Sequence, residues 1–139
     1  MVATATALIG FAGWFVLLSI ALGVYRSALI LAGRKAANAF ATDGRDLDPL
    51  GQRLTRARDN CFETLPLFAA LAVGASIAGR LDITDPLAMW VLYLRVAQST
   101  IHILSTSVPA VMVRATLFFA QVFIYAWWAI RLLSAASVS

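Results

Sequence analysis

A run of apolar residues from Ala5 to about Leu31, without a single acidic side chain, limits what this chain can fold into. The hydrocarbon layer of a membrane is about 30 Å thick, and a helix needs about 20 apolar residues to cross it. The run is too long for a cleavable leader and lacks the basic start of one. Three more apolar stretches follow, so we expect four membrane spans, at about residues 4–34, 50–80, 86–104 and 108–132.

The composition of the chain supports this interpretation. Hydrophobic residues make up 61% of the sequence and charged residues 13%, whereas soluble domains have roughly 45–50% and 25%. The sequence therefore predicts an all-α integral membrane protein, an antiparallel up-down four-helix bundle that forms one domain over residues 1–139. The formal net charge of +4 does not indicate nucleic-acid binding, because most of the excess lies near one loop.

That loop, about residues 39–52, sets the expected orientation in the membrane. It is rich in turn-forming and polar residues, and six of the eleven Lys and Arg residues lie in or beside it. Loops with such an excess stay in the cytoplasm. We therefore expect a multi-pass protein with this loop in the cytoplasm and both termini on the opposite side. The six basic residues are Arg34, Lys35, Arg45, Arg53, Arg56 and Arg58.

Three polar residues mark the start of the second span. Arg56, Asn60 and Glu63 follow one another at spacings of four and three, which places their side chains on one helix face. A guanidinium, an amide and a carboxylate at the edge of a membrane are costly to desolvate. We interpret them as half of a polar site for a charged small molecule, with the other half on the third and fourth spans.

The third span carries a similar set, Arg95, Gln98 and His102. Arg95 falls near the middle of the span, where an unpaired charge costs about 3 kcal/mol. Glu63 is the one acidic residue at a comparable depth, so we predict that Glu63 and Arg95 approach each other within a subunit. An inward ion pair of this kind also has a purely structural interpretation, since it would hold two helices together.

The fourth span contributes one polar residue near its start and an aromatic group near its end. Arg114 lies close to the inner boundary, and Gln121 follows two turns deeper. Tyr125, Trp127 and Trp128 predict an aromatic belt at the outer boundary. The single Cys and the single His exclude an intrachain disulfide and give no cluster of metal ligands, so we expect no metal.

These motifs together resemble the MAPEG family, the membrane-associated proteins of eicosanoid and glutathione metabolism. The segment from Arg56 to Thr64, RARDNCFET, followed by Pro66, has the family pattern RAxxNxxE and then a proline on the second helix. Arg95-Val96-Ala97 on the third helix is a second match, of the prostaglandin-synthase kind, and Ala39-Phe40-Ala41 is a weaker third. The resemblance covers nearly the whole chain.

The resemblance implies a homotrimer in the lipid bilayer with glutathione as co-substrate, bound between neighbouring subunits. Arginines suit the two carboxylates of this tripeptide. In the family an arginine at the start of the fourth helix stabilises the glutathione thiolate, and Arg114 is the candidate for that catalytic role here. The expected glutathione-binding residues are Arg34, Arg56, Asn60, Glu63, Arg95, Gln98 and His102.

Some positions depart from the family pattern. Arg114 lies two or three residues later than the activating arginine, Gln98 stands where a histidine is frequent, and His102 stands at a tyrosine position. Asp59 replaces a basic residue that often precedes the family's asparagine. An acidic side chain there would repel a carboxylate.

Three functions compete on this basis. The first is a glutathione-dependent transferase or peroxidase that acts on lipophilic electrophiles. The second is a non-catalytic membrane protein of the same fold that binds a small anion or serves as a scaffold. The third, a small multidrug exporter, is disfavoured, because such exporters rely on a carboxylate in the first span and Glu63 lies on the second, among arginines.

Overall fold

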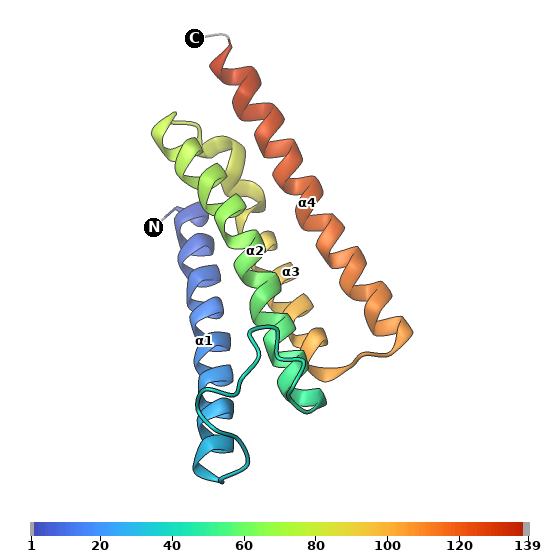
Figure 1. The fold of residues 1–139 in the computed structure, drawn as a ribbon. Helices are drawn as coiled ribbons and strands as arrows, with labels where there is room; N and C mark the ends of the chain where they lie inside the picture. Colours follow the sequence, from blue (N-terminus) through green and yellow to red (C-terminus); the bar gives the residue numbers. More distant parts are fainter. Residues whose placement is uncertain (1, 138–139) are drawn as a thin grey trace.

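The computed structural model describes residues 2–137, which form four long helices running alternately up and down (Figure 1). Each helix is long and apolar enough to cross a membrane. The bundle is therefore the all-α multi-pass membrane architecture that the apolar stretches predict. The helices are α1 (Ala3–Leu31), α2 (Pro49–Ile77), α3 (Leu81–Leu104) and α4 (Val108–Ala136).

Glycines end α1 and α2 three residues earlier than the sequence predicts. Gly33 has a φ of 66° and Gly79 a φ of 65°, the left-handed conformation that glycine adopts without strain. After α1, the Arg34 N–H donates to the Leu29 carbonyl at 3.0 Å, and after α2 the Arg80 N–H donates to the Ala75 carbonyl at 2.8 Å. Both helices thus close with the same C-terminal motif.

The start of α3 differs from the prediction, which placed it at about residue 86. The helix begins at Leu81 and includes Pro86. The Asp85 carboxylate caps α1, because Oδ1 accepts from the Thr4 N–H at 2.8 Å and from the Thr4 hydroxyl at 2.5 Å. An anion is stabilised at the positive end of a helix, so this contact ties α1 to α3.

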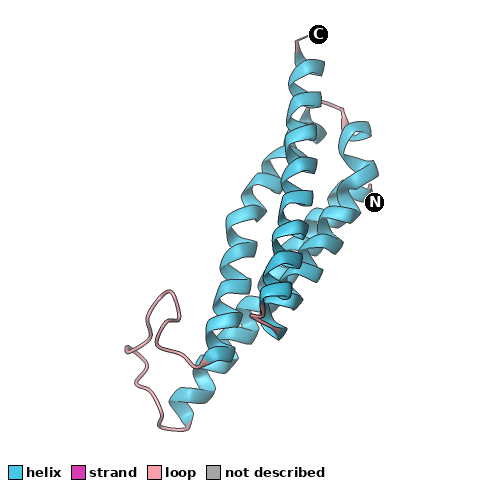
Figure 2. Ribbon diagram, turned by 90° about the vertical axis from the view of Figure 1, so that its right-hand side faces the viewer, coloured by secondary structure: helices cyan, strands magenta, loops and turns pink. Residues whose placement is uncertain are grey.

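The helices do not pack with equal closeness. Contacts join α1, α2 and α3 to one another, whereas α4 packs mainly along α3 and only lightly on α2. Figure 1 shows the N-terminal half of α4 leaning away from α2, at the end of the bundle that also carries the loop of residues 32–48, and Figure 2 shows that loop folded beside the same end. This divergence leaves room for a groove between α2, α3 and α4.

An aromatic cluster joins the helices at the other end. The Phe68 ring lies 5.8 Å from Phe11, 6.2 Å from Tyr125 and 5.9 Å from Trp128, measured between ring centres. Trp128 is completely buried and Tyr125 is 6% exposed, so the prediction that both belong to a boundary belt was wrong. Trp127 alone points outward, 43% exposed. Tyr125 and Trp128 lie on the face of α4 that packs against the bundle, where their large side chains fill the space between the helices.

Candidate functional site

A groove of about 320 Å³ opens between α2, α3 and α4 near the end of the bundle that carries the first loop. One side is polar and comes from all three helices. The other side is apolar and comes from one face of α4, at spacings of three and four residues. The polar lining residues are Asn60, Glu63, Gln98, His102 and Arg114, and the apolar ones are Val111, Ala115, Phe118 and Phe119.

The structure therefore brings together five of the eight residues that the sequence nominates. Asn60 and Glu63 lie on α2, Gln98 and His102 on α3, and Arg114 on α4. Val111 and Arg114 are one turn apart and line the same groove. The later position of Arg114, compared with the family pattern, thus leaves its side chain on the groove face of α4.

Arg114 and His102 form a direct contact across the groove. The Arg114 Nη1 lies 2.8 Å from Nδ1 of His102, and both side chains are half-buried. A guanidinium has only donors, so the imidazole nitrogen must accept. The histidine is therefore neutral in this arrangement, and its proton lies on Nε2.

Arg95 lies behind the groove, fully buried in the bundle. Its Nη1 donates to Oδ1 of Asn60, and its guanidinium lies 5.4 Å from the centre of the Phe11 ring. Within residues 2–137, its Nε and Nη2 have no hydrogen-bond partner. The prediction that this charge turns inward is correct, and a neutral amide and an aromatic face hold it there.

The predicted approach of Glu63 and Arg95 is wrong. Glu63 is exposed toward the groove, and no ion pair of the described residues includes it. Asn60 and Glu63 are three residues apart, which separates their directions by about 60° around the helix. The orientation of α2 about its own axis directs Asn60 toward Arg95 and leaves the Glu63 carboxylate in the groove.

A second polar contact joins Gln98 to Gln121, a residue that was not assigned to the site from the sequence. The Gln121 amide donates to Oε1 of Gln98 at 3.0 Å, and both side chains are buried. Gln121 lies seven residues after Arg114, hence on the same face of α4. This spacing of seven residues could have indicated from the sequence that Gln121 belongs to the site. The pair fixes the Gln98 side chain at the inner end of the groove.

Arg34 and Arg56 lie outside this groove. Arg34 is exposed and lines a separate cavity of about 130 Å³ with Tyr25 and Lys35. Arg56 is exposed on α2, one turn before Asn60. On a single chain, these two guanidinium groups are not part of the polar wall.

Asp59, the acidic departure from the family pattern, is neutralised locally. Its carboxylate is paired with the neighbouring Arg58 guanidinium through Nε and Nη2. Asp59 is not among the residues that line the groove. The repulsion of a carboxylate that the sequence suggests is therefore weakened by this pairing.

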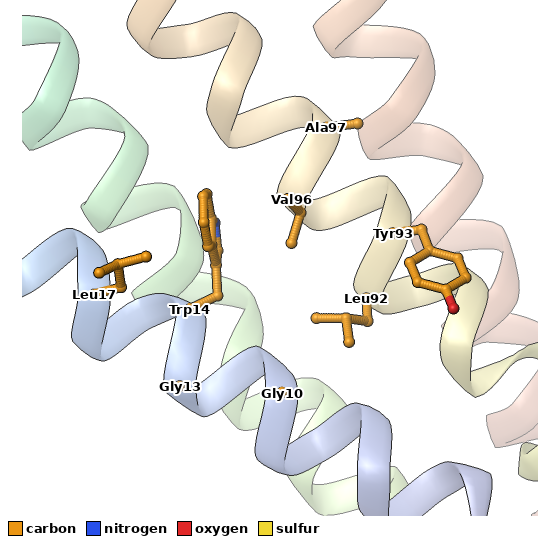
Figure 3. A pocket seen from close by; sticks show the side chains of 8 residues that line it. All are labelled: Gly10, Gly13, Trp14, Leu17, Leu92, Tyr93, Val96 and Ala97. Carbon is orange, nitrogen blue, oxygen red and sulfur yellow. The ribbon is translucent and has the colours of Figure 1, made fainter.

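A larger groove of about 480 Å³ lies elsewhere, between α1 and α3 (Figure 3). It is lined by Gly10, Gly13, Trp14, Leu17, Leu92, Tyr93, Val96 and Ala97. None of these residues carries a charge, and none lines the polar groove. Its surface is suited to acyl chains. The groove between α2, α3 and α4 is therefore the candidate functional site.

Comparison with known proteins agrees with the motifs and with this architecture. The sequence model of the MAPEG family matches residues 4–134. The chain belongs to the MAPEG family. No curated protein and no solved structure matches it. Family membership supports an integral membrane four-helix protein, and the chemistry of the groove has to be argued from its own residues.

Proposed function

We propose that this MAPEG-family protein is a glutathione-dependent transferase or peroxidase whose substrates are lipophilic electrophiles. The observation that carries the proposal is the convergence of Arg114, Glu63 and two amides on one groove that also has an apolar wall. The groove pairs groups for a charged, hydrophilic thiol with a surface for an apolar reactant. The groove lies between helices long and apolar enough to span a membrane, so lipophilic molecules would reach it from the bilayer.

The charges of the groove complement those of glutathione. The tripeptide has two carboxylates, an ammonium group and a thiol. Glu63 faces the ammonium group, while the Asn60 and Gln98 amides face the peptide bonds. Arg114 stabilises the thiolate, because a nearby cation lowers the pKa of a thiol, and the thiolate is the nucleophile. Phe118 and Phe119 hold the electrophile.

Conjugation is a substitution in which the glutathione sulfur replaces a leaving group on the electrophile. The thiol loses its proton to solvent, and the sulfur anion remains beside Arg114. The sulfur attacks an electrophilic carbon, the carbon–sulfur bond forms, and the leaving group departs with the bonding electron pair. The protein supplies the cation and the orientation, which are the effects that most lower the barrier of such a reaction.

Arg34 and Arg56 enter the proposal through assembly. We propose a homotrimer in which a neighbouring copy completes the groove, so that Arg34 of the partner subunit reaches a carboxylate of glutathione. The exposure of Arg34 on its own chain supports this, since an exposed side chain is accessible to another copy. We also propose that the loop of residues 32–48 lies in the cytoplasm, where glutathione is abundant, because basic residues gather in and beside it.

One observation favours a second function, a non-catalytic member of the family. Arg114 enters the groove later than the family's activating arginine, and its guanidinium already has a partner in His102. A groove of this kind would bind glutathione or another small anion without activating it. Binding without turnover is the result that this alternative predicts.

The test is conjugation of chlorodinitrobenzene by the purified protein, together with calorimetry of glutathione binding. Arg114→Ala should lower kcat/KM by about a hundredfold, the effect of removing one donor at a developing anion. Arg131→Ala is the matched control, since Arg131 lies on the same helix and stacks on Trp127 away from the groove. Equal turnover in the wild type and Arg114→Ala would refute the catalytic role. Binding without turnover would favour the alternative.

A further inference from the structure

The contact between His102 and Arg114 indicates a role for the single histidine of the chain. The two side chains come from α3 and α4, which are joined by the turn of residues 105–107. The α4 helix packs mainly along α3, so a contact between these two helices places Arg114 relative to α3. The imidazole is the one hydrogen-bond acceptor that the guanidinium meets among the described residues.

We propose that His102 is a positioning residue: its neutral imidazole accepts a hydrogen bond from Arg114 and holds the guanidinium in the groove. An arginine carries five donors on a flexible stem, so its charge is useful at a reacting atom only where something fixes it. His102 acts through Arg114 and needs no contact with the ligand. The functional consequence of this arrangement rests on the proposed glutathione activity.

Charged groups on three helices lie around the imidazole of His102. The charges that act on His102 are those of Arg114 on α4, Arg95 on its own helix and Arg56 on α2, and all three are cations. Glu63 on α2 lines the same groove and is the acidic group that faces it. Protonation of His102 would place a second cation at 2.8 Å from Nη1 of Arg114, so protonation and the contact exclude each other.

The first arm of the test needs no ligand. Labelling with ¹⁵N-histidine yields the ring nitrogens of His102 alone, because the chain has one histidine. In the wild type, Nδ1 should be unprotonated and hydrogen-bonded, and Nε2 should be protonated. Arg114→Met should remove the hydrogen-bond shift of Nδ1, while Arg131→Met should leave it unchanged. A protonated Nδ1, or identical spectra for the wild type and Arg114→Met, would overturn the proposal.

The second arm compares two replacements of His102. The Asn oxygen takes the place of Nδ1 and the Gln oxygen the place of Nε2, so only His102→Asn retains the acceptor for Arg114. We expect His102→Gln to lose about tenfold in kcat, with the KM for glutathione within about twofold. His102→Asn should recover most of that loss. Equal kcat values for the two variants would overturn the positioning role.

The two arms separate this inference from the proposed function. If the wild type conjugates no electrophile while Arg114→Met alters the histidine spectrum, the catalytic proposal fails and the coupling of the two side chains stands. If the wild type conjugates electrophiles and the histidine spectrum is the same in the wild type and in Arg114→Met, the positioning role fails and the catalytic proposal stands. Helical circular dichroism and elution volume show whether each variant is folded.

Discussion

Removing the amide of Asn60 should expose the cost of the buried charge on Arg95. The Arg95 side chain is 0% exposed, its Nη1 donates to Asn60, and within residues 2–137 its Nε and Nη2 have no partner. Asn60→Ala therefore deletes the main acceptor of a desolvated cation. A hydrogen bond to a charged group contributes about 1.5–3 kcal/mol, and stranding a buried charge costs about 3–5 kcal/mol.

We therefore expect Asn60→Ala to lower the free energy of unfolding by about 3 kcal/mol, since the Phe11 ring still faces the guanidinium and compensates in part. The assay is reversible unfolding in mixed micelles, followed by helical circular dichroism. Asn38→Ala is the matched control, because Asn38 is exposed in the first loop. Its unfolding free energy should change by less than about 0.5 kcal/mol.

A double-mutant cycle tests whether the loss arises from the charge. Arg95→Met removes the cation and keeps most of the side-chain volume, so Asn60→Ala should cost about 1 kcal/mol or less in that background. An equal loss in both backgrounds would show that Asn60 acts through packing and would refute the reasoning. A loss below about 0.5 kcal/mol in the wild-type background would refute it as well.

Three further predictions concern the loop, the helix ends and the core. The Lys35 ammonium lowers the pKa of Asp46 to about 2, so the contact between these two loop residues is stable at neutral pH and is lost as the pH falls through that value. Hydrogen exchange should show the loop opening near that pH. Asp46→Asn should abolish this pH-dependent opening. Gly79→Ala should cost about 1 kcal/mol in unfolding experiments because of the positive φ, and no loss would contradict the cap. Trp128→Ala should cost about 3–5 kcal/mol and Trp127→Ala far less, and a reversed order would contradict the assignment of these two rings to core and surface.

The four spans and the inward orientation of Arg95 on α3 could be predicted from the sequence. Apolar stretches of sufficient length predict membrane helices, because a membrane leaves the backbone few alternatives. A cation in the middle of a span must turn away from lipid, and Arg95 does. Spacings of three and four also predicted that Asn60, Glu63, Gln98 and His102 face a common space, and all four line the groove.

The partners of these side chains were harder to predict. Glu63 was the obvious counter-ion for Arg95, but the choice between Glu63 and Asn60 depends on a rotation of α2 by about 60°, which no local pattern specifies. The same holds for Tyr125 and Trp128. Their chemistry suits a membrane boundary, yet the packing of α4 against Phe68 buries them. Contacts between helices decided both outcomes.

The central claim is that the groove between α2, α3 and α4 binds glutathione with its sulfur beside Arg114. Cryo-electron microscopy of the protein in nanodiscs with glutathione tests it most directly. The account predicts density for the tripeptide in this groove, with the sulfur next to the Arg114 guanidinium and the ammonium group toward Glu63. Density for glutathione in the apolar groove beside Trp14, or an empty polar groove at saturating glutathione, would contradict it.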